Sequence, residues 1–170
     1  MKKIILLFIA GLTIISCGGN KKKELEELES VKPDKFAIIM DAIYEKNDSI
    51  AVFPKVGANF LYDKPVTYKV RGSELIQRIT INMPDGMTLS SFAIVASTNK
   101  EQKHLTIKNI SLKNKDVLVL DGDNYKHNDF FMPDMSFVWD PKLLRCDLVH
   151  TNQYPPGLVG SRKLEELLAQ

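Results

Sequence analysis

The chain has 170 residues, of which 23 are Lys or Arg and 21 are Asp or Glu, giving a formal net charge of +2. Lys2 and Lys3 supply that excess, so the chain after them is neutral. A neutral chain with no basic stripe gives no electrostatic basis for binding nucleic acid, and this class of partner is excluded. At this length, one domain can bury a core of its own.

An apolar segment follows the basic N-terminus. Met1-Lys2-Lys3 precedes Ile4 to Ile15, which only Gly11 and Thr13 interrupt. A basic flank followed by a short apolar run is typical of a secretory signal peptide. The run is too short to span a bilayer as a helix, which takes about 20 apolar residues. We therefore expect residues 1–16 to be a signal peptide.

The signal ends at a cysteine. The sequence Ile14-Ile15-Ser16-Cys17 resembles the lipobox of bacterial lipoproteins, in which two aliphatic or small residues and a small residue precede an invariant Cys. The resemblance implies cleavage after Ser16 and a diacylglycerol on the Cys17 thiol, with acyl chains such as palmitate holding the protein on a membrane. Two or three acyl chains anchor a protein stably, whereas one does so marginally. An ordinary secretory signal with a chance Cys is the alternative.

Residues 17–32 are expected to form a lipidated, charged and flexible tether. Gly18-Gly19-Asn20 is followed by Lys21 to Ser30, which is rich in charge. In Bacteroidetes-type lipoproteins, charged residues just after the Cys can direct export to the cell surface, and Lys21 to Glu24 loosely resembles that pattern. The expected location is the bacterial cell envelope, on the outer membrane. The periplasmic face and the cell surface are the two alternatives.

From residue 33 onward, the pattern predicts strands. Phe36 to Tyr44 alternates and is expected to be a strand apolar on both faces, forming a hairpin with 49–54. Further strands are expected at 66–70, 79–83, 92–96, 105–112, 116–120, 137–139 and 144–150. Along 105–112 the apolar spacing slips at Lys108-Asn109, which predicts a β-bulge. Residues 161–169 are expected to form a short helix capped by Ser161.

Many short strands separated by turns favour a mainly β fold, an antiparallel β-sandwich over residues 33–170 with a short C-terminal helix. The segment from Lys69 to Leu112 is similar to galactose-binding-like jelly rolls. It has Gly72-Ser73, an alternating strand that ends at Pro84, a following strand at 92–96, and the segment Ile107 to Leu112. The resemblance implies a jelly-roll-like sandwich that binds glycans through loops at one end.

Local signatures of catalysis are absent from the sequence. His104, His127 and His150 form no zinc-protease spacing, and there is no nucleophile elbow, P-loop or dinucleotide fingerprint. We expect a protein that is not an enzyme, with His104 and His127 on solvated loops. Cys146 has no partner once Cys17 is lipidated, and we expect it to be a buried, small apolar residue.

An acidic loop offers oxygen ligands. Asp121, Asp123 and Asp129 could contribute to a structural calcium site, since Ca²⁺ takes six to eight oxygens. The segment lacks the EF-hand spacing, and an ordinary acidic turn is the alternative. No cofactor other than this calcium is expected.

The same loop carries the expected ligand site. Sugars present an apolar face and a rim of hydroxyls, so we look for exposed aromatics beside hydrogen-bonding residues. Tyr125, Asn124, Asn128 and Trp139 are the candidates, with core packing as the alternative for each aromatic. The segment Phe130 to Pro133 is either a core plug or an exposed loop tip. We expect a binding protein for a glycan or another envelope ligand. An assembly lipoprotein that binds an envelope protein is the alternative, and a hydrolase is third.

Overall fold

Strand β1 (Phe36–Tyr44) alternates between buried and half-buried side chains along its whole length. The computed structural model describes residues 33–170, which group into one unit. The expected signal peptide (1–16), the tether (17–32) and Cys17 lie outside the described residues. One face of β1 is buried in the core, where it contributes Ile38, Met40, Ala42 and Tyr44. The other face is half-buried, so the strand is central in its sheet, as expected from its apolar pattern.

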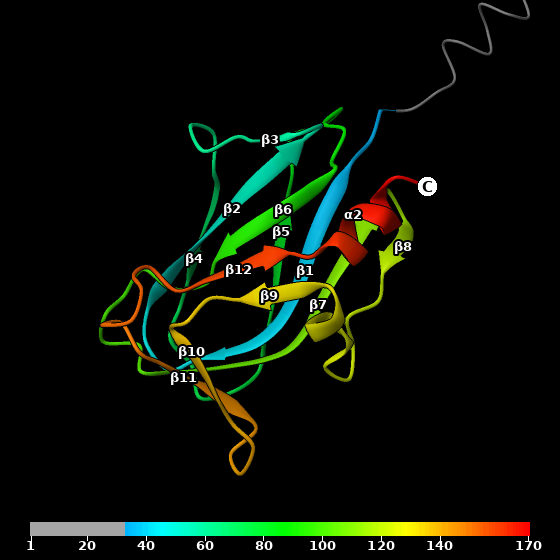
Figure 1. Ribbon diagram of the computed structural model, residues 1–170. Coiled ribbons are helices and arrows are strands. Elements are labelled where there is room, and N and C mark those ends of the chain that lie inside the picture. The colour runs from blue at the N-terminus through cyan, green and yellow to red at the C-terminus, as the bar shows by residue number, and fades with distance from the viewer. Residues whose placement is uncertain (1–32) are drawn as a thin grey trace, which may run out of the picture. The chain divides into compact units, whose positions relative to one another are not determined.

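Two six-stranded antiparallel sheets pack as a sandwich (Figure 1), which confirms the expected mainly β fold. The first sheet has the order β10-β11-β7-β1-β5, with β8 also beside β7. Its remaining strands are β5 (Gln77–Asn82), β7 (His104–Asn114), β8 (Val117–Leu120), β10 (Phe137–Asp140) and β11 (Arg145–Leu148). The second sheet has the order β3-β2-β6-β12-β9, with β4 also beside β2. It contains β2 (Asp48–Val56), β3 (Asn59–Phe60), β4 (Val66–Val70), β6 (Ser91–Val95), β9 (Phe131–Pro133) and β12 (Gly157–Gly160).

The predicted hairpin over residues 36–54 is wrong. Strand β1 pairs with β5 and β7, whereas β2 pairs with β3, β4 and β6 in the other sheet. The turn between β1 and β2 therefore crosses the sandwich. Both strands bury every second residue, and packing those two faces against each other removes more apolar surface from water than pairing the strands edge to edge.

The β-bulge at Lys108-Asn109 is confirmed. Along the β1–β7 pair, Asp41 lies opposite Asn109, but the next residue, Ala42, lies opposite Ile107. Lys108 of β7 thus has no residue of β1 opposite it. The extra residue restores Ile107 and Ile110 to the buried face of the sheet.

Helix α2 (Arg162–Leu168) is present at the predicted place, with Leu164 buried against the core. Ser161 occupies the N-cap, but its hydroxyl makes no capping bond. It donates instead to the carbonyl of Asp129, at 3.3 Å. The predicted N-cap position is confirmed, but a nonlocal acceptor takes the hydroxyl in place of a capping bond.

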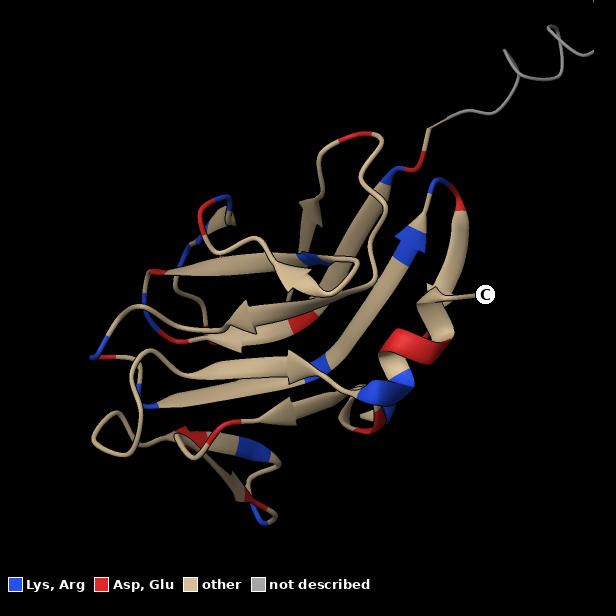
Figure 2. Cartoon of the chain, turned by 45° about the horizontal axis from the view of Figure 1, so that its top comes forward, with Lys and Arg blue, Asp and Glu red and all other residues tan. Residues whose placement is uncertain are grey.

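Strands β3, β9 and β12 and the 3-10 helix η1 (Lys126–Asp129) were not predicted. Lys, Arg, Asp and Glu residues lie mainly around the loops and sheet margins, with both signs interspersed (Figure 2). The described chain begins at the end of the sandwich opposite the projecting β10–β11 hairpin (Figure 1). Within residues 33–170, no helix has the length and apolarity needed to cross a bilayer.

Candidate ligand-binding cleft

A cleft of about 340 Å³ opens between the margins of the two sheets. Strand β10 ends the first sheet and β9 ends the second, and η1 lies across the gap. Ligand sites for small molecules typically occupy ~300–1,000 Å³. The described residues that line the cleft are Ile107, Tyr125, His127, Asn128, Phe131, Pro133, Phe137, Trp139, Cys146 and Leu158.

The loop that carries Tyr125 and His127 is fixed to strand β7 through Gly122. A Cβ atom on Gly122 would lie 1.9 Å from the carbonyl oxygen of Ile110, so only glycine fits there. The Gly122 N–H donates to the Ser111 hydroxyl at 3.1 Å. The chain then turns through a left-handed conformation at Tyr125, with φ of 64°. This turn, close against β7, aims Tyr125 and His127 at the cleft.

Three of the four predicted ligand-binding residues meet in this cleft: Tyr125, Asn128 and Trp139. The rings of Tyr125 and Trp139 lie edge to face, with centroids 6.1 Å apart and an interplanar angle of 70°. Trp139 is 47% exposed, so core packing is ruled out for it. Tyr125 is half-buried between Trp139 and His127. An aromatic pair with one open ring can contact a flat apolar ligand face.

Asn124 does not line the cleft. It has a left-handed backbone, with φ of 53°, and its N–H donates to the Asp123 carboxylate at 2.9 Å. Its role in the structure is to form the turn that presents Tyr125.

His127 is buried at 5% exposure, so its predicted place on a solvated loop is wrong. Its Nδ1 lies 3.4 Å from the Gly122 carbonyl oxygen. Burial lowers the pKa of His127 below its ordinary value, against a smaller opposing effect of that carbonyl. The imidazole is therefore neutral at physiological pH. With the proton on Nδ1, its Nε2 can only accept a hydrogen bond.

The aspartates expected to bind calcium have other partners. Asp121 lies 3.6 Å from the Lys126 ammonium, and Asp129 lies 2.9 Å from that of Lys163. Asp123 accepts a hydrogen bond within its own turn. Among residues 33–170, no three Asp, Glu, His or Cys side chains form a group able to hold a metal ion. The described residues thus give no support to the calcium site.

Cys146 is a free thiol in the wall of the cleft. Burial, with a smaller contribution from the nearby Asp147 carboxylate, raises the pKa of Cys146 to about 11. Because the thiolate is the nucleophile, this cysteine is unreactive at neutral pH. It is half-buried rather than part of the core.

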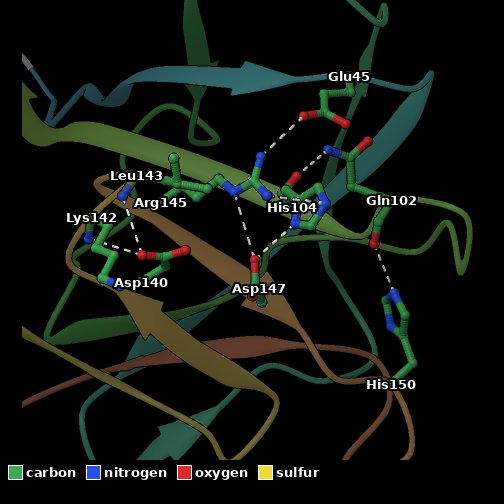
Figure 3. Close-up of polar contacts among 9 residues, drawn as sticks. All are labelled: Glu45, Gln102, His104, Asp140, Lys142, Leu143, Arg145, Asp147 and His150. Atoms are coloured by element: carbon green, nitrogen blue, oxygen red, sulfur yellow. Dashed lines mark hydrogen bonds and ion pairs between the residues drawn. The ribbon is translucent and has the colours of Figure 1, made fainter.

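A second cluster of polar residues surrounds His104, where β11 pairs with β7 (Figure 3). Nδ1 of His104 donates to the Asp147 carboxylate at 2.8 Å, and Nε2 lies 3.3 Å from Nη2 of Arg145. Arg145 also approaches Glu45, with its Nη1 3.9 Å from Oε1. His104 is on a strand, so its predicted loop position is wrong. Both of its ring nitrogens have partners, and the group ties the β10–β11 hairpin to the end of β1.

The sequence did not identify His127 or the cleft floor. The floor consists of Ile107, Phe131 and Leu158, which are buried and come from three strands of the two sheets. One local signal was present, because Phe131 belongs to the segment expected to be a core plug or loop tip. Phe131 is the plug, while its neighbour Met132 is exposed.

No protein-family model, curated protein or solved structure was found to match this chain.

Proposed function

We propose that this chain is a lipid-anchored binding protein of the bacterial cell envelope, without catalytic activity, that recognises a glycan in the cleft. The observation that carries the proposal is the meeting of Tyr125 and Trp139, beside Asn128, at the mouth of a cleft of ligand size. The open indole can stack on the apolar face of a sugar ring, and the amide can bond its hydroxyls.

The polar atoms of the cleft support this reading. Within the described residues, the Tyr125 hydroxyl, the Asn128 side-chain amide and the indole N–H of Trp139 make no hydrogen bond. None of the three residues is buried, so their polar groups are accessible to a ligand that displaces water from them. A saccharide would supply hydroxyl partners to all three.

Glycan binding by the cleft can be tested on an array of bacterial and host glycans. We expect saturable binding to a restricted set of saccharides. Tyr125→Ala should weaken it about 10-fold, because the mutation removes one ring of the aromatic pair. Tyr68→Ala is the matched control, since Tyr68 is a partly exposed tyrosine of β4 that does not line the cleft. Binding to no glycan, or equal losses in the two variants, would refute the proposal.

The anchor is proposed from the lipobox alone.

Cys17→Ser should abolish labelling by a clickable fatty acid and release the protein from membranes, because the thiol that carries the lipid is gone. Cys146→Ser is the control and should label normally, since Cys146 is an internal thiol in the cleft wall. Continued labelling of the Cys17→Ser protein would contradict the anchor.

A second candidate function, binding to an envelope protein, is favoured by one observation. Met132, Met135 and Val138 are all exposed, in β9, the following loop and β10. Among the described residues, no strand pairs with the outer edge of β10. A bare edge with exposed apolar side chains is a recognised place for strand addition by a partner.

A further inference from the structure

The walls of the cleft carry no charge at neutral pH. None of its described lining residues is Asp, Glu, Lys or Arg, and its one histidine, His127, is buried with a lowered pKa. Two charges of the η1 helix itself are paired outside the cleft: Lys126 faces Asp121, and Asp129 faces Lys163. A charged ligand group would enter the cleft without a counter-charge, and burying an unpaired charge is costly. The cleft therefore selects an uncharged ligand.

Most polar groups of the cleft come from η1 and the residue before it. Tyr125, His127 and Asn128 all come from η1 and the residue before it, and Trp139 faces Tyr125 from β10. Together they offer hydroxyl, amide and indole donors and the acceptor Nε2 of His127. A ligand needs both donors and acceptors to match them, as the hydroxyls and amide of a sugar provide.

The floor of the cleft is apolar. Ile107, Phe131 and Leu158 close it from three strands, and each is less than one-tenth exposed. Phe131 packs on Phe92, with ring centroids 5.2 Å apart, so this floor continues directly into the core. A hydroxyl pressed against such a floor would lose its hydrogen bonds to water without replacement, whereas a methyl group would gain from burial.

We propose, building on the glycan-binding function above, that the cleft takes an uncharged saccharide residue bearing a methyl group. The methyl group sits on the floor formed by Ile107, Phe131 and Leu158. The ring stacks on Trp139, and its polar rim bonds to Tyr125 and Asn128. Acetamido sugars and 6-deoxy sugars share this chemistry, because each places one methyl group beside a hydroxylated ring.

The test is calorimetric titration of the purified full chain with matched sugars. For the acetamido class, N-acetylglucosamine is compared with glucose, glucosamine and glucuronic acid. For the deoxy class, L-fucose is compared with L-galactose, which differs by one hydroxyl. We expect at least one methyl-bearing sugar to bind about 10-fold more tightly than its hydroxyl counterpart, which is a typical value for one methyl-sized group in an apolar pocket. We also expect glucosamine and glucuronic acid to bind at least that much more weakly.

Two asparagines provide the control. Asn128→Ala should weaken binding of the preferred sugar, because Asn128 lines the cleft. Asn59→Ala should leave binding unchanged, because Asn59 is an exposed residue of β3 that does not line the cleft.

The outcomes separate the two proposals. Equal binding of methyl-bearing and hydroxyl sugars, or equal binding of glucuronic acid, would overturn this inference and leave the glycan function standing. An equal effect of both asparagine variants would place the site elsewhere and overturn the inference. Failure of every sugar, here and on the glycan array, would overturn the glycan function itself.

Discussion

Asp48→Ala is expected to lower the free energy of unfolding by about 4 kcal/mol. Asp48 is 8% exposed, and its carboxylate joins the start of β2 to the loop after β6. It accepts hydrogen bonds from the Ser97 hydroxyl at 2.6 Å and from the backbone N–H groups of Thr98 and Asn99 at 2.8 and 3.0 Å. It also accepts one from the N–H of Ser49 at 2.7 Å. Alanine would leave these donors without their acceptor, and the Ser97 residue among them is fully buried.

Urea denaturation followed by far-ultraviolet circular dichroism measures this loss. Asp63→Ala is the control, since Asp63 lies in an exposed turn and should change stability by less than about 0.5 kcal/mol. If the two variants were equally stable, the carboxylate would have no structural role of this size.

This result also bears on the hollow beside Asp48. The hollow measures about 660 Å³ and is lined in addition by Lys69, Arg71 and Lys100. Its one acidic side chain is occupied by loop hydrogen bonds. We therefore assign Asp48 to holding the loop and place the ligand in the cleft beside η1.

Gly122→Ala is expected to cost about 3 kcal/mol and to displace the loop that carries Tyr125. The added Cβ would lie 1.9 Å from the Ile110 carbonyl oxygen and 2.7 Å from its carbon. Both atoms belong to β7, which is paired on both sides, so the loop must move instead. The Gly122 carbonyl also accepts the N–H of His127 at 3.3 Å, and hence the displacement reaches the cleft.

Two measurements check this prediction: urea denaturation for stability, and the fluorescence emission of Trp139, the single tryptophan of the chain. Gly57→Ala is the control. Its Cβ would meet no atom within 4 Å, but its φ of +57° makes a side chain strained. We expect a loss of about 1 kcal/mol there and no change in emission. A Gly122→Ala protein as stable as the Gly57→Ala protein, with unchanged emission, would show that the close approach is not maintained in solution.

The strands were predictable where the signal is local. The alternation of Phe36 to Tyr44 identifies a strand and its buried face, because side chains of a strand point alternately to its two sides. The slip at Lys108 predicts the bulge for the same reason. Strand β12 (Gly157–Gly160) was missed because its short, glycine-flanked sequence has almost no alternation.

Pairing between strands was less predictable. Residues 36–54 have the spacing of a hairpin, and only the packing of two buried faces decides that β1 and β2 lie in different sheets. The same limit applies to Ser161, whose hydroxyl bonds to Asp129 across 32 residues.

The candidate site was predictable in its exposed members and not in its floor. Tyr125 and Asn128 lie in a polar loop, and this position identified them as candidate ligand-binding residues. The sequence left the position of Trp139 open, because a tryptophan at the end of a strand can be exposed or can pack in the core. His127 gave no signal, since its burial depends on contacts with Gly122 and the cleft walls.

The most direct measurement of ligand binding in the cleft is a two-dimensional ¹H–¹⁵N spectrum of the labelled chain during titration with diacetylchitobiose, a neutral disaccharide with two acetamido methyl groups. Trp139 gives the one indole N–H signal of the protein. We expect this signal and the amide signals of Tyr125 and Asn128 to shift together and saturate, while those of Asn47 and Asn99 stay in place. Shifts centred on Asn47 and Asn99, or an indole signal that never moves, would contradict a glycan site between Tyr125 and Trp139.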